Sequence, residues 1–482
     1  MPRFPHLLLL ALLATTGARA ADMPHYRVTL DAEMRQATVE LCLMQAHAQA
    51  SFAADSASAM RFIHDLKRSG GAALDDGESE WSAARWRAGE CLSYRADIAA
   101  IADTRDQDIG WRIGADIVTA PQLWLLRADA QGESGADLRI ALPQGWNISA
   151  PWHALGSDAG GTHFHIDDTP PDWSAAVAFA HMAEERIALP GGVLRLTILD
   201  GADAVQRAKL HDWLAHVSRA VLSAYGRLPL QDVQVLMIPV ASMGMARRAV
   251  AAFAPRAVHF GQSIRGEGNA LELLIDPSRP AAEFDDDWVA VHELSHLMHP
   301  YLGDRGTWLA EGLATYYQNV LRGRSGLLTP AQAWDRLRVG FMDNDGKQYD
   351  TPLDRGAATM HRTHDFDRVY WSGAAYWLRV DHDLRRDSRG KLNMALALAR
   401  FHDCCLPAHR QWQPQEFTAK LDELLGVTTF SDRYREFAAL RQFPDWRKVY
   451  EDLGIRAGAD GHLEFVADSP GAAVRDAIVA HD

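Results

Sequence analysis

The chain has 482 residues, of which 48% are hydrophobic and 23% charged. This composition excludes an intrinsically disordered or collagen-like chain, and the length suggests two or three domains. Aspartate and glutamate number 63 against 49 lysines and arginines, and the formal net charge of −14 argues against nucleic acid or an anionic membrane as the main partner.

The first 20 residues have the pattern of a signal peptide. Arg3 supplies a positive charge, residues 7–14 form an apolar run, and Ala18 and Ala20 suit a signal peptidase. The apolar run is too short for a membrane span, which takes about 20 residues. No later run is long enough either. We therefore expect residues 1–20 to be removed and the protein to be exported without a membrane span, most simply to a bacterial periplasm.

Residues 21–200 have the pattern of a β-rich domain. Short runs of aliphatic and aromatic residues alternate there with turn residues, which predicts strands. Strands at this spacing are typical of an antiparallel β-sandwich. The predicted strands cover residues 26–30, 37–43, 91–98, 123–127, 138–142 and 193–199.

The pattern becomes helical from about residue 201. We expect a second domain over residues 201–450, with strands at 232–239 and 271–275 and mostly helices after residue 285, followed by a short tail at 451–482. Apolar residues at intervals of three or four predict the first of these helices. They are Leu210, Leu214, Val217 and Val221.

The four cysteines fall into two pairs. Cys42 and Cys91 lie in predicted strands of the first domain, and an oxidising compartment would allow them to pair. Cys404 and Cys405 are neighbours in the chain. Because a bridge between neighbours is strained, two thiols are the favoured interpretation for this pair and a vicinal disulfide is the alternative.

The strongest chemical signal is an H-E-x-x-H motif. His292 and His296 are four residues apart, so they lie on one face of a helix where both imidazoles are able to bind one metal ion. Glu293 lies about 100° further round that helix, where it is able to reach a metal-activated water and act as general base. Aspartates at 285–287 suit the positive end of a helix, and Pro300 marks its expected end.

A second predicted helix supplies a candidate third ligand. Catalytic zinc usually takes three protein ligands and leaves a fourth position open. Glu311 lies in the segment W-L-A-E-G, fifteen residues after His296. A carboxylate among apolar neighbours is costly to bury unless it is paired or bound to metal. A solvated glutamate is the alternative, but the nearby motif favours a Zn²⁺ ligand.

The segment H-E-L-S-H followed by W-L-A-E-G-L-A-T-Y-Y resembles the gluzincin peptidases and, more closely, the glycyl aminopeptidase family. The segments H-Y-R-V-T-L and C-L-S-Y-R also resemble strands of that family. The resemblance implies an α+β multidomain protein, in which an N-terminal antiparallel β-sandwich precedes a thermolysin-like, mainly helical zinc-peptidase domain. The family often carries a C-terminal PDZ domain, for which residues 451–482 are too few.

The resemblance also implies a donor for the oxyanion that forms during peptide hydrolysis. Tyr370 lies in the segment Y-W-S-G-A, which matches a family segment with a tyrosine in this role. A core aromatic residue is the alternative interpretation. Tyr316 and Tyr317 are rival donors, although their place on the ligand helix favours packing.

Gluzincin aminopeptidases carry a G-x-M-E-N segment before the zinc helix, and its acidic residue binds the free amine of the substrate. The matching turn contains the predicted substrate-binding residues Gly266, Gly268 and Asn269. Gly268 stands where the glutamate is expected, with Glu267 and Glu272 nearby. The alternative is an edge strand that pairs with extended substrate and needs no special residue.

We therefore expect an exported zinc-dependent peptidase, with Zn²⁺ as cofactor and a peptide or protein as substrate. The resemblance favours an aminopeptidase that acts on small N-terminal residues. An endopeptidase of the same fold and a non-catalytic binding protein of the cell envelope are the alternatives. The intact Glu293 favours catalysis, because a binding protein has no chemical need for the base. The sequence carries no signal for the oligomeric state.

Overall fold

The computed structural model describes residues 23–71, 73–104, 110–129, 135–242, 256–458 and 462–480. The predicted signal peptide, residues 1–20, lies outside these described residues. The chain divides into two compact units, one made of residues 1–183 and 264–268 and the other of residues 184–263 and 269–482. No helix in the described part of the chain combines the length and the apolar character that a membrane span requires.

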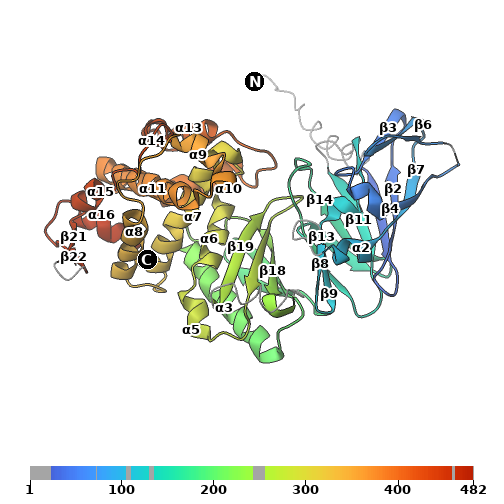
Figure 1. The fold of residues 1–482 in the computed structure, drawn as a ribbon, viewed down its shortest axis with the longest axis horizontal. Helices are drawn as coiled ribbons and strands as arrows, with labels where there is room; N and C mark the ends of the chain where they lie inside the picture. Colours follow the sequence, from blue (N-terminus) through green and yellow to red (C-terminus); the bar gives the residue numbers. More distant parts are fainter. Residues whose placement is uncertain are drawn as a thin grey trace, which may run out of the picture. The chain divides into compact units, whose positions relative to one another are not determined.

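The first unit contains fifteen strands among the described residues (Figure 1). They are β1 (His25–Leu30), β2 (Ala37–Leu43), β3 (His47–Ala53), β4 (Ile63–Arg68), β5 (Asp75–Asp76), β6 (Glu80–Trp86), β7 (Glu90–Ala96), β8 (Gly110–Ile113), β9 (Asp116–Thr119), β10 (Arg127–Ala128), β11 (Ala136–Ala141), β12 (Asn147–Ser149), β13 (His153–Asp158), β14 (Gly161–Ile166) and β15 (Val177–Ala180). Three short helices accompany them: η1 (Ala59–Phe62), α2 (Ile98–Asp103) and η2 (Pro121–Leu123).

These strands form three sheets around one core. The largest sheet has the order β13-β14-β11-β1-β2-β7-β4, and the two smaller sheets have the orders β10-β3-β6-β5 and β12-β15-β9-β8. Val28, Phe52 and Val177, one from each sheet, are fully buried in a common cluster. The described pairs are antiparallel except for β1 with β11. The prediction of an N-terminal β-sandwich is confirmed.

The register of β2 and β7 places two cysteines directly opposite each other. Cys42 pairs with Cys91 in the ladder, and their sulfur atoms form a disulfide with the Cα atoms 4.0 Å apart. Val39 and Leu41 of the same strand are fully buried. Because side chains alternate between the two faces of a strand, Cys42 lies on the other face from these core residues.

Residues 123–127 do not form the predicted strand. The first of them, Leu123, is the last residue of the 3-10 helix η2, and only Arg127 enters a strand, β10. The carbonyl of Leu126 accepts a hydrogen bond from the hydroxyl of Tyr26 (2.7 Å), and that of Trp124 accepts one from Tyr94 (3.1 Å). The segment is buried as a strand would be, but tyrosine side chains satisfy these backbone carbonyls instead of a neighbouring strand.

The second unit begins with a five-stranded sheet of order β16-β17-β18-β20-β19. Its strands are β16 (Glu185–Leu189), β17 (Gly192–Ile198), β18 (Asp232–Pro239), β19 (Val258–Ile264) and β20 (Ala270–Ile275). Pairs β17–β18 and β18–β20 are parallel, and β19 forms one edge. Strand β17, predicted as residues 193–199 of the first domain, therefore belongs to the second unit.

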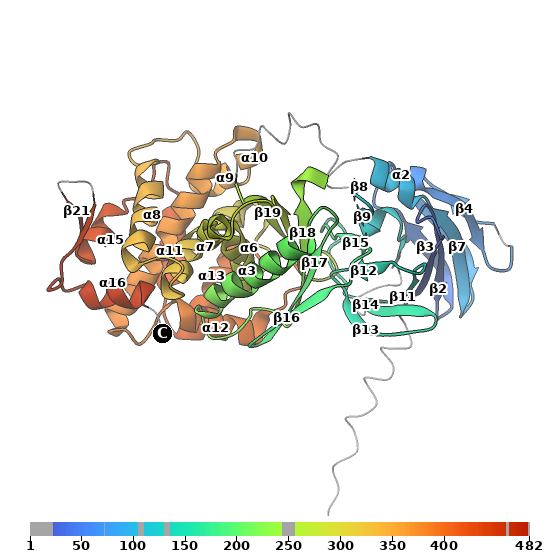
Figure 2. The ribbon, with the colours of Figure 1, turned by 90° about the horizontal axis from the view of Figure 1, so that it is seen from below.

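The rest of the second unit is mainly helical, as predicted, and Figure 2 shows α3 running beside β17 and β18. Leu214 of α3 shares one core cluster with Val235 of β18 and Leu273 of β20. The helices are α3 (Ala204–Leu222), α5 (Ala281–Asp286), α6 (Val289–Ser295), α7 (Gly303–Arg324), α8 (Pro330–Met342), α9 (Leu353–Ala357), α10 (Met360–Thr363), α11 (Phe366–Ser388), α12 (Met394–Cys405), α13 (Pro414–Leu425), α14 (Thr429–Ala438), α15 (Arg447–Asp452) and α16 (Ala472–Val479), with 3-10 turns η4 (Val240–Ser242) and η5 (His296–Met298).

The C-terminal tail is an ordered part of the second unit. It contains the end of α15, the pair β21 (Ile455–Ala457) and β22 (Leu463–Phe465), and α16. The guanidinium of Arg324, at the end of α7, donates a hydrogen bond of 2.7 Å to the carbonyl of Ile478 in α16. The tail therefore packs against the helix that carries Glu311.

Cys404 and Cys405 form a vicinal disulfide, so the favoured prediction of two thiols is wrong. Their Cα atoms are 3.7 Å apart, and both residues lie at the C-terminal end of α12. Adjacent cysteines are always within reach of each other. What decides between a bridge and two thiols is the local backbone conformation at the helix end, which the sequence pattern does not reveal.

Candidate metal centre

The helix that carries the H-E-x-x-H motif is shorter than predicted. It ends at Ser295, so His296 is the first residue of the 3-10 turn η5. Of the three aspartates expected at its start, only Asp287 lies there. Its carboxylate accepts a hydrogen bond of 2.8 Å from the amide of Val289, while the other two aspartates belong to α5. One carboxylate therefore satisfies an otherwise unpaired amide of the first turn.

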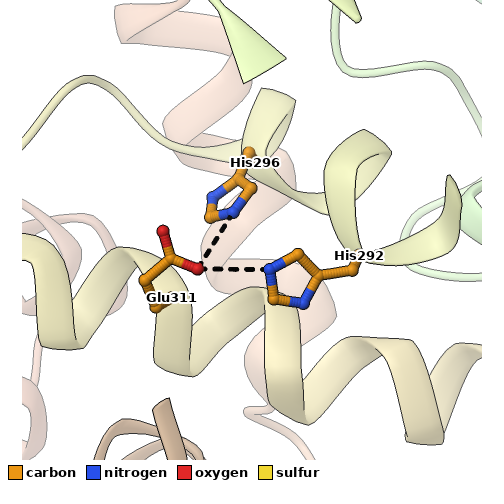
Figure 3. A group of neighbouring side chains, drawn as sticks. All are labelled: His292, His296 and Glu311. Carbon is orange, nitrogen blue, oxygen red and sulfur yellow. Dashed lines mark hydrogen bonds and ion pairs between the residues drawn. The ribbon is translucent and has the colours of Figure 1, made fainter. Parts of the chain in front are cut away.

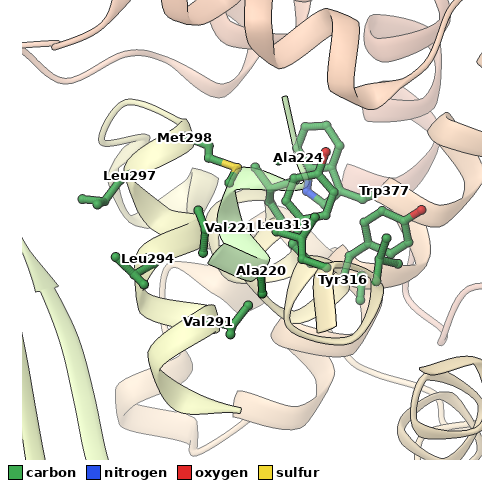
Figure 4. Close-up of a cluster of buried hydrophobic side chains, with 14 of the residues drawn as sticks. Ala220, Val221, Ala224, Val291, Leu294, Leu297, Met298, Leu313, Tyr316 and Trp377 are labelled. Atoms are coloured by element: carbon green, nitrogen blue, oxygen red, sulfur yellow. The ribbon is translucent and has the colours of Figure 1, made fainter. Parts of the chain in front are cut away.

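An apolar cluster holds α6 and η5 in place (Figure 4). The cluster lies between this segment, α3, α7 and α11, and its labelled members are at most 1% exposed. Because α6 packs its apolar side into this core, the polar residues of the motif lie on its remaining sides. The labelled members are Ala220, Val221, Ala224, Val291, Leu294, Leu297, Met298, Leu313, Tyr316 and Trp377.

His292, His296 and Glu311 come together as predicted (Figure 3). Oε2 of Glu311 is 3.2 Å from Nε2 of His292 and 3.5 Å from Nε2 of His296. The three ligand atoms lie within 4.8 Å of one another, and no other such set of three occurs among the described residues. Their side chains are only 3%, 8% and 18% exposed, in the same order.

The three residues fit a zinc ion. Nδ1 of His292 is 2.8 Å from the amide oxygen of Gln318, which only accepts, so this nitrogen carries the proton. In the neutral ring, the Nε2 lone pair then faces the carboxylate oxygen of Glu311. Two acceptors that face each other need a proton or a metal ion between them. Two imidazoles and one carboxylate are also a common ligand set of catalytic zinc.

The charges around Glu311 favour its ionised form. Burial by itself would lower the pKa of His292, but the hydrogen bond that the protonated ring donates to Glu311 and the charges of Glu293 and Glu311 raise it above the ordinary histidine value. Burial would likewise raise the pKa of Glu311, yet His296 and His292 hold it well below its usual range. Glu311 is therefore ionised at neutral pH, as a metal ligand must be.

The predicted general base, Glu293 of α6, is held against the edge strand β19. Ser263 Oγ is 2.7 Å from the carbonyl oxygen of Glu293 and 3.1 Å from its Oε2. At Gly261, a Cβ atom would lie 2.8 Å from Cγ of Glu293 and 2.5 Å from a methyl group of Val289. A glycine is needed there because the base passes so close to the strand.

Tyr370 also lies at the metal group. Its ring stacks on that of His292, with centroids 5.8 Å apart and planes 10° from parallel. Burial, and then the charge and hydrogen bond of Glu311, raise the pKa of Tyr370 far above its ordinary value, so its hydroxyl stays protonated as a donor. The rival Tyr316 donates instead to Asp381 at 3.0 Å.

A contact between two glycines sets the distance between the helices that carry Glu311 and Tyr370. A Cβ at Gly373 of α11 would lie 1.9 Å from the carbonyl oxygen of Trp308 and 2.6 Å from Cα of Gly312, both in α7. The two helices therefore touch backbone to backbone. Any side chain at this crossing would push Tyr370 away from the metal group.

Gly373→Ala is expected to lower the free energy of unfolding by about 1–3 kcal/mol or more, because a methyl group cannot fit against the Trp308 backbone. Chemical denaturation measures the loss. Gly323→Ala is the matched control on α7, since its nearest obstacle is a methyl group at 3.0 Å. If the two variants lose equal stability, the close backbone contact is not what makes Gly373 necessary.

The predicted substrate-binding residues lie in a tightly packed turn. Gly266 and Gly268 belong to the first unit, whereas Asn269 belongs to the second, with the metal group. The amide of Gly266 donates to the carbonyl of Ser174 at 2.8 Å, and a Cβ at Gly268 would lie 2.1 Å from the carbonyl oxygen of Pro151. Both glycines are explained by close backbone contacts, and their role in substrate binding stays a prediction.

The two acidic residues near this turn are both hydrogen-bonded within the protein. Oε2 of Glu267 accepts a bond of 2.7 Å from the indole of Trp152, and burial raises the pKa of Glu267. Oε2 of Glu272, on β20, accepts a bond of 2.6 Å from the amide of Gln262. Neither residue is one of the three that make up the metal group.

Four residues around the metal group were not assigned to it from the sequence. Gln318 and His299 contact the two ligand histidines, and Ser263 and Gly261 contact Glu293. A signal existed for the first two: Gln318 is seven residues after Glu311 and His299 is three after His296, spacings that share one helical face. No such signal exists for the strand residues, because pairing over long distances fixes their place.

By sequence, the chain matches no protein-family model and no curated protein. Solved structures with the same fold are nevertheless found. An aminopeptidase N family protein from Idiomarina loihiensis superposes with a TM-score of 0.66 at 15% identity, covering 93% of this chain and 82% of that one. An M1 zinc metallopeptidase from Deinococcus radiodurans, a glutamate-to-alanine mutant bound to Tyr-Ser-Ala, gives 0.52 at 12% identity, covering 88% and 95%.

A two-domain M1 zinc metallopeptidase mutant bound to L-arginine is similar as well, with a TM-score of 0.53 at 11% identity, covering 88% of this chain and 95% of that one. The fold is therefore that of the M1 zinc metallopeptidases, a β-rich domain followed by a mainly helical one. This confirms the fold class expected from the sequence. The narrower resemblance to the glycyl aminopeptidase family stays a prediction.

Proposed function

We propose that the chain is a zinc-dependent peptidase. The observation that carries the proposal is the convergence of His292, His296 and Glu311 on one point, with Glu293 and Tyr370 beside them. The likeness in fold to M1 zinc metallopeptidases supports it. A binding protein without catalysis would need neither a base held by a strand hydroxyl nor a protonated tyrosine at the same place.

Each of these side chains has a separate role in peptide hydrolysis. When bound, Zn²⁺ polarises the scissile carbonyl and lowers the pKa of a water that it holds. Glu293 takes a proton from the attacking water and passes it to the leaving amine. Ser263 keeps Glu293 in position, because its Oγ lies 2.7 Å from the backbone carbonyl oxygen of Glu293 and 3.1 Å from Oε2 of the carboxylate. Tyr370 donates a hydrogen bond to the oxyanion of the tetrahedral intermediate.

Aminopeptidase action on small N-terminal residues is the finer assignment that we propose. A structure of the same fold is described as an aminopeptidase N family protein, and M1 relatives are described with a tripeptide and with a free amino acid bound. The preference for small residues rests on the resemblance of the motif segments to the glycyl aminopeptidase family.

One observation favours an endopeptidase as the second candidate. Glu267 and Glu272, the acidic residues nearest the predicted amine-binding segment, are hydrogen-bonded to Trp152 and Gln262. Because both side chains already have a partner within the protein, we assign neither of them to the free amine of a substrate. An extended peptide that pairs with edge strand β19 would not need one.

Paired substrates separate the two candidates. Glycyl and alanyl reporters are assayed beside their N-acetylated forms, with and without a chelator. We expect chelator-sensitive release from the free-amine forms alone, because an aminopeptidase requires the amine. Equal cleavage of the acetylated forms would replace this assignment with an endopeptidase. Cleavage that survives complete removal of metal would end the zinc-peptidase proposal.

Tyr370→Phe is expected to lower kcat by about 10²–10³-fold while KM stays nearly constant, because the lost hydroxyl acts on the oxyanion and not on the bound substrate. Steady-state kinetics on the reporter that wild type cleaves best provides the test. Tyr376→Phe is the control, since that hydroxyl donates to the carbonyl of Phe430 inside the core. A Tyr370 variant with full kcat would remove the residue from the mechanism.

We also propose that the protein is exported to the periplasm. Two disulfides, Cys42–Cys91 and Cys404–Cys405, support this because such bonds persist in oxidising compartments. Cell fractionation followed by N-terminal sequencing is the test. We expect periplasmic protein that begins at Ala21, and cytoplasmic protein that retains residues 1–20 would contradict the proposal.

A further inference from the structure

His299 touches the metal ligand His296 from one residue beyond η5. It is 2% exposed, and its ring meets that of His296 edge-on with centroids 5.3 Å apart. Its Nε2 is 3.1 Å from Nδ1 of His296, and its own Nδ1 is 2.8 Å from the carbonyl oxygen of Pro300. These groups form a hydrogen-bonded row that ends at the metal group.

The carbonyl oxygen fixes the direction of this row. Because it only accepts, Nδ1 of His299 carries a proton and donates it to Pro300. The other nitrogen of a neutral imidazole has a lone pair, so Nε2 of His299 accepts the hydrogen bond from Nδ1 of His296. In the neutral ring of His296, the lone pair then lies on Nε2. This is the nitrogen that lies 3.5 Å from Oε2 of Glu311.

The other ligand histidine is held by a different acceptor. Nδ1 of His292 is 2.8 Å from the amide oxygen of Gln318, so in the neutral ring of His292 the lone pair lies on Nε2. The imidazole of His299 thus accepts a hydrogen bond from Nδ1 of His296, just as the side-chain amide of Gln318 accepts one from Nδ1 of His292. Acceptors of this kind orient metal-bound histidines, and their loss typically costs 10–100-fold in metal affinity.

The protein itself holds His299 in place. The residue leaves the 3-10 turn in an extended conformation, with φ −141° and ψ 157°. Leu297 and Met298, just before it, are 1% and 0% exposed. The carbonyl of Tyr301, two residues after it, accepts a hydrogen bond of 2.8 Å from the amide of Trp412. Because both flanks are anchored, the ring is in position without help from a bound cation.

We propose that His299 is a positioning residue of the metal centre. It fixes His296 in the tautomer and orientation in which Nε2 binds Zn²⁺. The inference rests on the metal site of the proposed function but not on peptidase activity, since it concerns the affinity for the ion.

A pair of amide variants tests the acceptor directly. Gln at residue 299 places its amide oxygen near the position of Nε2, where it still accepts from His296. Asn is one carbon shorter, so its amide reaches Pro300 but not His296. The zinc dissociation constants of metal-free wild type, His299→Gln and His299→Asn are measured by competition with a chromophoric chelator, and thermal melts of the metal-free proteins check that each is folded.

We expect His299→Asn to bind zinc about 10–100-fold more weakly than wild type and His299→Gln to stay close to wild type. If both variants bind zinc as tightly as wild type, or if both are weakened equally, His299 only packs. The inference is then overturned while the proposed function stands. If folded wild type binds no zinc, the proposed function fails and the inference falls with it. Because the two variants differ by one methylene, a general loss of folding would affect both.

Discussion

Glu293→Gln is expected to lower kcat by at least about 10²–10⁴-fold while the protein stays folded and binds zinc as wild type does. The amide keeps the size of the side chain but cannot take a proton from water. None of the three ligand atoms belongs to this residue, so the metal should stay. Ser263 Oγ is still able to donate to the carbonyl of residue 293, so the helix should also keep its place beside β19.

Three measurements on the same preparation decide this prediction: kcat, bound zinc and the melting temperature. Glu283→Gln is the control, because Glu283 lies ten residues earlier on α5 and pairs with Arg279 at the surface. It should change none of the three. Substantial turnover by Glu293→Gln would show that another group activates the water, and the assignment of the base would be wrong.

Glu311→Ala is expected to lose stoichiometric zinc and to lower hydrolysis by at least about a thousandfold. The carboxylate oxygen is the only anionic ligand of the group, and it lies 3.2 and 3.5 Å from the two imidazole nitrogens. Without it, two neutral imidazoles remain, which is one ligand fewer than catalytic zinc usually has. Elemental analysis after dialysis against zinc, followed by the reporter assay, measures both losses.

Asp304→Ala is the matched control for this variant. Asp304 is an exposed carboxylate near the start of the same helix, seven residues before Glu311, and its removal should leave zinc content and activity unchanged. A Glu311→Ala protein that retains one zinc per chain would mean that another side chain is the third ligand. That result would contradict the site while leaving the fold untouched.

The sequence was most informative where the chemistry depends on local spacing. His292, Glu293 and His296 follow from the geometry of one helix, and Glu311 follows from the cost of burying a carboxylate among apolar neighbours. The structure brings the predicted ligands within reach of one ion. The predicted fold class, a β-sandwich before a mainly helical domain, also followed from the change in hydrophobic period near residue 201.

The sequence was less informative where contacts join distant parts of the chain. Ser263 and Gly261 act through the pairing of β19 in a sheet, and nothing local marks which residue of that strand meets Glu293. Residues 123–127 look like a strand because they are apolar, but hydroxyl groups of Tyr26 and Tyr94 supply their hydrogen bonds. In both cases the deciding partner lies at least 30 residues away in the chain.

The placement of β17 shows the same dependence on distant pairing. Its residues have ordinary strand character and follow a long series of strands, so their pattern resembles more of the first domain. In the structure they pair with β16 and, in parallel, with β18, which is more than 30 residues further along the chain. A parallel pair needs a long crossover, here helix α3, and only that pairing assigns the strand to the second unit.

The central claim is that His292, His296 and Glu311 hold a zinc ion, and anomalous diffraction at the zinc edge tests it most directly. In crystals of the zinc-loaded protein, the account predicts one strong peak per chain, at about 2.0–2.2 Å from Nε2 of both histidines and from a carboxylate oxygen of Glu311. A peak bound by other side chains, or a protein that takes up zinc with no peak at this point, would contradict it.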